Sequence, residues 1–255
     1  MLLNELRQQG DTLYRWRSYL PVPLTLLLFV ALALPPATPG WHAGAAWWDW
    51  LALSASLAGL AIRIHTIGHA PPFTSGGNVR KQVAAELNTT GCYSIVRHPL
   101  YLGNLLMWLG PAVFVRSLWI VLICLLAFWL YYERIMCAEE DFLETRFGSR
   151  FRAWSAATPA LFPLFRSWET PRLPFTVRRV LRREYNAFLA IAALFCLLVL
   201  WRSWLHGPGL TLPASWMLLL ATATLTFLLC LVVKKRTSLL EVTRDQGCQT
   251  GGRED

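Results

Sequence analysis

Charged residues are scarce in this 255-residue chain. They make up 15% of it, whereas an average soluble domain carries about 25%. Hydrophobic residues make up 55% and come in blocks along the chain. This composition excludes a disordered chain and a coiled coil, and it does not fit an ordinary soluble domain. It is typical of an integral membrane protein.

The chain also lacks the usual sequence marks of metal, redox and secreted proteins. None of its six cysteines forms a CxxC pair, so neither a zinc site nor a reactive dithiol is indicated. It has no glycine-rich loop of the soluble dinucleotide-binding type. Charged residues recur through residues 1–19 without a clear cleavage site after them, which does not fit a secretory signal. We expect no metal and no nucleic-acid partner.

Six apolar segments are long enough, or nearly so, to cross a bilayer, which takes about 20 residues. The sequence therefore predicts an all-α, polytopic membrane protein with about six transmembrane helices and a pocket on the cytoplasmic side. The approximate bounds of the six segments are 19–34, 47–68, 100–115, 118–136, 186–205 and 214–233. A group of tryptophans between the first two resembles an interfacial aromatic belt: Trp41, Trp47, Trp48 and Trp50.

Lysine and arginine are missing from two of the loops, 35–46 and 206–213, and the short hairpin after the third segment holds only Arg116. Basic residues gather in the other loops instead, most densely over residues 166–183. The positive-inside rule then places both termini and both long loops in the cytoplasm, at a bacterial inner membrane or the endoplasmic reticulum. The basic stretch 166–183 is either this orientation signal or a surface attracted to anionic lipid.

The first chemically distinctive block is GCYSIVRHPLYLGNLLMWLG, residues 91–110. Pro99 suits the first turn of a helix, so Arg97 and His98 are expected at the cytoplasmic mouth of the third segment. An alternative interpretation needs no function: Arg97 reaches the lipid headgroups, His98 caps the helix and Tyr101 is an interface anchor.

The second block is ERIMCAEEDFLETRFGSRF, residues 133–151, which continues the fourth segment. Glu133, Cys137 and Glu140 fall on one side of a helix. A solvated amphipathic helix explains most of the block, but not Glu133, because an acidic group near an apolar run is costly and is a functional candidate. The two blocks together place a His, a Tyr and carboxylates around one pocket that suits a cation with a flat aromatic group.

The order and spacing of these blocks resemble the isoprenylcysteine carboxyl methyltransferase family, which is similar to the phospholipid methyltransferases. The resemblance covers residues 84–163. Phe151 and Trp154 stand where the family usually has Tyr, so two hydroxyls are lost. The matching residues are Gly91, Tyr93, Arg97, His98, Pro99, Tyr101 and Gly103, then Glu139, Glu140, Leu143, Phe147 and Gly148, and finally Pro159 and Pro163.

The resemblance implies S-adenosylmethionine as methyl donor and a lipid or prenylated acceptor that enters from the bilayer. It implies acceptor-side or catalytic roles for Arg97, Arg134 and Glu140. Methyl transfer from a sulfonium agrees with such a site, because its barrier falls mainly through positioning and desolvation. The residues implied to bind the cofactor are Leu87, Tyr93, His98, Pro99, Leu100, Tyr101, Gly103 and Glu139.

We divide the chain into an N-terminal part, a methyltransferase core, a basic linker with two further spans, and a polar tail expected to be disordered: 1–83, 84–163, 164–236 and 237–255. A carboxylate or phosphate acceptor is favoured, because an amine would need a base of raised pKa such as Glu133 or Glu140. Two alternatives stay open: a non-catalytic lipid-binding scaffold, and a sterol-reductase-like enzyme that uses NADPH. The acceptor, the oligomeric state and the role of the last two helices are not determined by the sequence.

Overall fold

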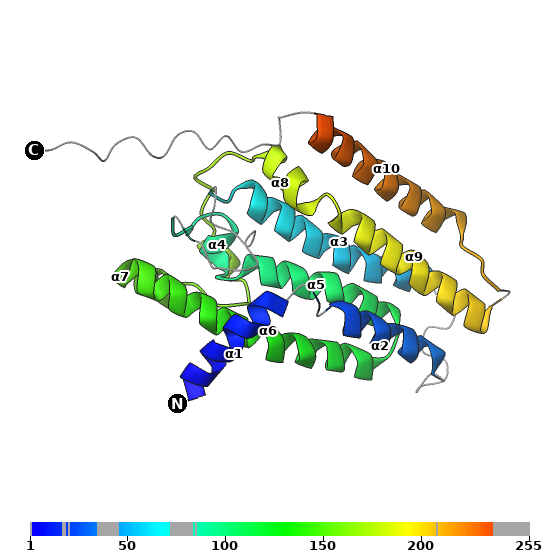
Figure 1. The fold of residues 1–255 in the computed structure, drawn as a ribbon, viewed down its shortest axis with the longest axis horizontal. Coiled ribbons are helices and arrows are strands. Elements are labelled where there is room, and N and C mark those ends of the chain that lie inside the picture. Colours follow the sequence, from blue (N-terminus) through cyan, green and yellow to red (C-terminus); the bar gives the residue numbers. More distant parts are fainter. Residues whose placement is uncertain are drawn as a thin grey trace, which may run out of the picture.

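The computed structural model describes residues 2–16, 19, 21–34, 46–71, 84, 86–207 and 209–236. These residues form helices and no strand, as predicted (Figure 1). Trp41, Arg80, Lys81 and the tail 237–255 lie outside the described residues. Four helices are long and apolar enough to cross a membrane: α3 (Ala46–Gly68), α6 (Leu118–Phe147), α9 (Ala187–His206) and α10 (Ala214–Arg236).

The other two predicted spans are less regular. The helices α1 (Leu2–Trp16) and α2 (Pro21–Ala33) meet at a 75° bend and qualify as one span only when they are taken together. The helix α5 (Pro99–Phe114) has 16 residues. At about 1.5 Å per residue it is shorter than the hydrocarbon core of about 30 Å. The described residues therefore give four spans, or five with the bent pair, and the predicted count of six is not confirmed.

The helices α3 and α5 pack closely because glycines line their crossing. A methyl group on Gly103 would come within 2.6 Å of the Arg63 side chain and 2.8 Å of the Gly59 carbonyl oxygen. One turn further along, the Ser56 hydroxyl donates a hydrogen bond to the Met107 carbonyl at 3.0 Å. This contact fixes the start of α5, and therefore His98, relative to α3.

A buried acidic residue ties the C-terminal spans to this core. Asp49, at the start of α3, is 5% exposed. It accepts a hydrogen bond from Arg116 at 2.9 Å and two from Arg202 of α9, at 2.9 and 2.5 Å. The Arg202 guanidinium also lies 4.5 Å from the centre of the Phe114 ring. Arg116, the only basic residue of the hairpin in the sequence, is thus part of an ion cluster.

The opposite end of the bundle carries the short elements. Figure 1 shows α4 (Cys92–Ile95), α7 (Ser149–Ala157) and α8 (Val177–Glu184) gathered there, next to the last turns of α3 and the first turn of α5. Both sequence blocks contribute residues to this end, because α6 is a single helix of 30 residues that continues beyond the apolar part.

Candidate functional site

His98 is the centre of the candidate site. It precedes Pro99 at the first turn of α5, and it is 7% exposed. Its Nε2 lies 2.8 Å from Glu140 Oε1, and its Nδ1 lies 3.5 Å from Glu139 Oε2. Burial disfavours the imidazolium, but the two carboxylates outweigh that effect and raise the pKa of His98 above its ordinary value of 6.5. The structure thus brings three predicted site residues together.

The two carboxylates differ in how fully they are engaged. Glu140 Oε1 receives His98 and also lies 3.0 Å from Arg97 Nε. Glu139 makes the longer contact with the imidazole, and the two carboxylate side chains are about equally exposed, at 26% and 27%. Glu140 is therefore held by shorter contacts than Glu139.

Arg97 has one buried N–H that no hydrogen-bond acceptor satisfies. The NH1 group donates to the Ser155 carbonyl at 2.8 Å, but Nε, although close to Glu140, makes no aligned hydrogen bond. A buried donor without an aligned acceptor is costly, and the attraction to the Glu140 carboxylate 3.0 Å away offsets part of that cost.

Backbone hydrogen bonds hold the Arg97–His98 segment against the chain that follows α7. The amides of Arg97 and His98 donate to the carbonyls of Pro159 and Ala160 at 2.8 and 3.2 Å. The Leu164 amide donates back to Ile95 at 2.9 Å. These backbone hydrogen bonds explain why the later prolines follow the two sequence blocks at this spacing.

Trp154 stands where the resembling family usually has Tyr, and its indole N–H is a hydrogen-bond donor of a different kind. Its indole N–H donates to the Tyr93 carbonyl at 3.0 Å. Phe151 is 3% exposed and packs against Trp154 with ring centres 5.7 Å apart. This position therefore still carries a hydrogen-bond donor, and its bond holds α4 against α7.

Aromatic rings continue inward from His98. The Tyr101 ring lies nearly parallel to the imidazole, with centres 5.6 Å apart, and contacts the Tyr132 ring at 4.9 Å. The Phe128 ring stacks on Tyr132 at 4.2 Å. The Tyr101 hydroxyl also hydrogen-bonds the Glu139 carboxylate. This row of rings provides faces of the kind that attract a cation.

Three residues of the site were missed in the sequence analysis. Arg63 of α3 donates to Glu184 of α8 through Nε at 3.1 Å and NH2 at 2.5 Å, and to Asn104 Oδ1 through NH1 at 2.6 Å. The Asn104 amide in turn donates to the Tyr132 hydroxyl at 3.1 Å. Arg63 was detectable as a charged residue inside an apolar run. Glu184, the one acid after a run of arginines, gave a weaker signal.

The remaining predicted cofactor residues differ in exposure. Leu87 is 5% exposed, and Pro99 is fully buried beneath His98. Leu100 is half-buried. Gly103 faces Gly59 and Arg63 at the α3–α5 crossing, so its small size is explained by helix packing.

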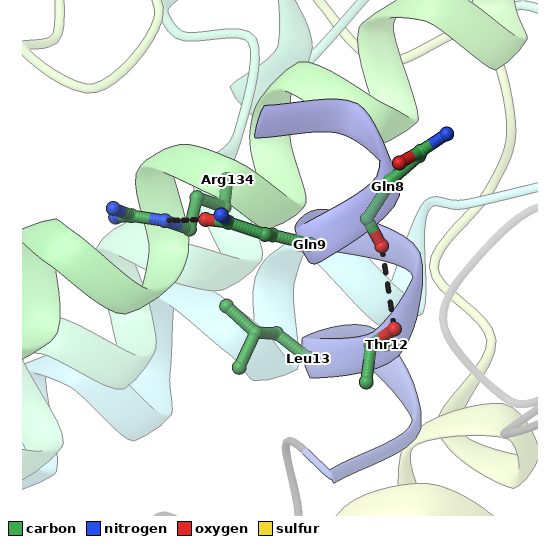
Figure 2. Close-up of a pocket in the computed structure, with 5 residues that line it drawn as sticks. All are labelled: Gln8, Gln9, Thr12, Leu13 and Arg134. Atoms are coloured by element: carbon green, nitrogen blue, oxygen red, sulfur yellow. Dashed lines mark hydrogen bonds between the residues drawn. The ribbon is translucent and has the colours of Figure 1, made fainter. Parts of the chain in front are cut away.

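Arg134 faces a different neighbour from Glu140. The two residues are six positions apart on α6, which turns their side chains about 120° from each other. The Arg134 guanidinium donates to Gln9 of α1 at 2.7 Å and to the Leu130 carbonyl. It borders an open pocket of about 550 Å³ that is also lined by Gln8, Gln9, Thr12 and Leu13 (Figure 2).

The comparison with protein families identifies this region. Residues 50–150 match the family described as phospholipid methyltransferase. The match covers less than half of the chain. The matched range contains most of α3 and all of α4, α5 and α6. Glu184 and the residues of α7 after position 150 lie outside it.

Curated relatives agree with the family. Protein-S-isoprenylcysteine O-methyltransferase of Schizosaccharomyces pombe is 30% identical over 31% of this chain and 33% of its own length. Nickel-cobalt-cadmium resistance protein NccN of Alcaligenes xylosoxydans xylosoxydans is 35% identical over 48% of this chain and 59% of its own length. Cobalt-zinc-cadmium resistance protein CzcN of Cupriavidus metallidurans is 42% identical over 30% of this chain and 35% of its own length. The chain thus spans about a third to three fifths of the length of these relatives.

No solved structure matches the chain. Two of the relatives are named for metal resistance, but within the ranges that the structure describes, no three His, Cys, Asp or Glu side chains are grouped to hold a metal ion. The chain is an integral membrane protein with a segment that is similar to the phospholipid methyltransferase family.

Proposed function

We propose that the chain transfers a methyl group from S-adenosylmethionine to a lipid or lipidated acceptor at the cytoplasmic face of its membrane. The observation that carries the proposal is the contact of His98 with both Glu139 and Glu140. It joins the two blocks that match a methyltransferase family. The family match and the isoprenylcysteine methyltransferase relative support the reaction class.

The residues present fit this cofactor. The Glu139 carboxylate, which is 26% exposed, suits an ammonium group. The Tyr101 ring, stacked beside His98, is the aromatic group proposed to lie next to a sulfonium or an adenine. His98 contacts both carboxylates, and Pro99 and Leu100 follow it in the first turn of α5. Tyr93 and Leu87 are proposed as further cofactor contacts.

When bound, the cofactor supplies an electrophilic methyl carbon: an acceptor oxygen forms a bond to it while the carbon–sulfur bond breaks and its electron pair stays on sulfur. A carboxylate or phosphate acceptor is already anionic at neutral pH, so no proton has to move. Glu140 is held by His98 and Arg97 and is not free to take a proton from an amine. This engagement favours an anionic acceptor.

Arg134 is proposed as an acceptor-side contact because it borders the open pocket between α1 and α6 (Figure 2). The cytoplasmic placement of the site rests on the distribution of lysine and arginine along the chain. Rival functions differ in the cofactor they require: a scaffold needs none, and a reductase needs NADPH.

Purified full-length protein in detergent tests the proposal. We expect calorimetry to detect binding of S-adenosylhomocysteine and not of NADPH. With a tritiated methyl donor, label should enter N-acetyl-S-dodecylcysteine or phosphatidic acid in preference to phosphatidylethanolamine. Binding of NADPH alone would favour the reductase, and binding of neither nucleotide would favour the scaffold.

A further inference from the structure

The helix α8 lies outside the segment that matches the family, yet one of its side chains enters the bundle. Glu184, at its end, is 6% exposed and accepts two hydrogen bonds from Arg63 of α3, at 3.1 and 2.5 Å. Arg63 lies inside an apolar span, where a charged residue is costly and is a functional candidate. A buried ion pair is often no more stabilising than apolar side chains of similar volume. The further contacts of Arg63 indicate a role beyond joining the two helices.

The Arg63 side chain is held in one orientation. A methyl group on Gly103 would come within 2.6 Å of Arg63 Cγ and 3.3 Å of Cδ, so the bare glycine lets the stem lie across α5. The guanidinium then reaches the next residue, Asn104, and NH1 donates to its Oδ1 at 2.6 Å. All three nitrogens of the guanidinium have an acceptor, because Nε and NH2 donate to Glu184. A planar group with three such contacts is fixed in its plane.

The side-chain amide of Asn104 passes this constraint on to α6. An arginine only donates, so it binds the amide oxygen and sets which way the amide faces. The NH2 group of Asn104 then faces Tyr132 and donates to its hydroxyl at 3.1 Å. The orientation of the amide therefore depends on Arg63, and the hydrogen bond to Tyr132 depends on that orientation.

Tyr132 supports the aromatic part of the candidate site. It is 4% exposed, and its ring centre lies 4.9 Å from that of Tyr101. The Tyr101 ring stacks beside the His98 imidazole with centres 5.6 Å apart, and its hydroxyl hydrogen-bonds the Glu139 carboxylate. Direct contacts thus lead without a gap from the end of α8 to the residues expected to bind the cofactor.

We propose that Glu184 is a positioning residue for the cofactor site: through Arg63 and Asn104 it fixes Tyr132, and Tyr132 holds the Tyr101 ring in the place where the cofactor binds. The inference rests on the proposed function. It assigns to α8, which the family match does not include, a part in cofactor binding.

An alternative is that the Arg63–Glu184 pair only docks α8 on α3. Asn104→Leu separates the two interpretations, because it keeps both hydrogen bonds between Arg63 and Glu184 and removes the link to Tyr132. If the pair only docks α8, this variant should bind S-adenosylhomocysteine normally. If the pair positions the site, the variant should bind it as weakly as Glu184→Gln does.

Calorimetry with the purified full-length protein in a nonionic detergent measures this affinity. We expect Glu184→Gln, Asn104→Leu and Tyr132→Phe each to bind S-adenosylhomocysteine about threefold to tenfold more weakly, which corresponds to the loss of one hydrogen bond. The double variant Glu184→Gln/Tyr132→Phe should be no weaker than the weaker single variant, because both changes break the same series of contacts. Normal affinity in Asn104→Leu and Tyr132→Phe would overturn the proposal, and so would losses that multiply in the double variant. These two single variants decide the matter if Glu184→Gln does not fold.

Asp49→Asn is the matched control, since it breaks another buried ion pair of α3, at the opposite end of the helix. It should lower the Tm and leave the affinity for S-adenosylhomocysteine unchanged. If Asp49→Asn weakens binding as much as Glu184→Gln does, the effect is general destabilisation and the proposal is wrong.

A measurement without cofactor separates this proposal from the proposed function. In protein labelled with 3-fluorotyrosine, Tyr101→Phe identifies the fluorine resonance of Tyr101. Glu184→Gln and Asn104→Leu should shift that resonance, and Asp49→Asn should not. A Tyr101 resonance that stays in place in both of the first two variants would overturn the proposal. If the resonance shifts but the unmodified protein binds no S-adenosylhomocysteine, the positioning of the ring stands and the methyl-transfer function fails.

Discussion

His98 Nε2 and Glu140 Oε1 lie 2.8 Å apart, although the two residues are 42 positions apart in the chain. The contact spans from the first turn of α5 to the part of α6 that continues beyond its apolar stretch. Arg97 reaches the same carboxylate oxygen at 3.0 Å. Two sequence blocks that could each be explained as ordinary membrane-interface structure therefore form one charged cluster. Glu139, whose contact with His98 is the longer of the two, is the carboxylate that we expect to bind a ligand.

Glu139→Gln is expected to weaken binding of S-adenosylhomocysteine. The substitution keeps the size of the side chain and removes a charge-assisted hydrogen bond worth about 1.5–3 kcal/mol, which corresponds to roughly ten- to a hundred-fold in affinity. Calorimetry in detergent measures the change. Glu144→Gln, on the same helix and in an exposed pair with Arg152, is the control and should bind normally. Unchanged affinity in both Glu139→Gln and His98→Ala would contradict the site.

The ion pair of His98 predicts a pH-dependent stability. Its pKa is raised in the folded protein, so the stabilisation is fully present below the ordinary value of 6.5 and is lost as the pH rises through the raised pKa. The Tm difference between the unmodified protein and Glu140→Gln should be larger at about pH 6 than at about pH 9. It should not vanish at high pH, because Arg97 also loses its carboxylate. An equal difference at both pH values would show that His98 stays neutral.

The core of the site could be predicted from the sequence because its residues lie in two compact blocks. Helix periodicity and the start signal at Pro99 placed both blocks at helix ends, and the structure joins them at His98 and Glu140. The Arg63–Glu184 pair could not be predicted in this way. Its residues are 121 positions apart, and their contact depends on how α8 folds back on α3, which local patterns do not encode.

The number of spans was difficult to predict for a related reason. Hydropathy measures the apolar length of a segment but not its direction. It therefore could not predict the 75° bend between α1 and α2. The position of Arg134 shows the same limit. Its distance along the helix from Glu139 was clear from the sequence, whereas its contact with Gln9 depends on how α1 packs against α6.

Reporter fusions test the orientation of the chain. A fusion after Ala43 and one after Gly209 should report the non-cytoplasmic side, and one after Arg178 should report the cytoplasm. The expectation follows from the scarcity of lysine and arginine in the first two loops and their abundance around the third. A non-cytoplasmic signal after Arg178 would reverse the topology and would separate the site from a cytoplasmic methyl donor.

Asp49→Asn is expected to destabilise the protein without affecting the cofactor site. The substitution leaves Arg116 and Arg202 facing each other at a buried position, and breaking a buried ion pair in this way costs about 3–5 kcal/mol. Thermal unfolding in detergent should show a clearly lower Tm, while S-adenosylhomocysteine affinity at low temperature stays the same. A Tm within error of the unmodified protein would mean that the cluster does not hold α9 to α3.

Arg134→Lys separates acceptor contact from cofactor binding. If Arg134 contacts the acceptor at the open pocket of Figure 2, the Lys variant should bind S-adenosylhomocysteine normally and show a raised acceptor KM, because a point charge cannot replace the two-pronged guanidinium. The structural alternative is that Arg134 only holds α1 through Gln9. Gln9→Ala then serves as the control, because it removes that hydrogen bond and keeps the guanidinium. A raised KM in Arg134→Lys but not in Gln9→Ala supports the acceptor role. Near-normal kcat/KM in the Lys variant would make Arg134 an anchor for α1 and leave the acceptor contact to Arg97.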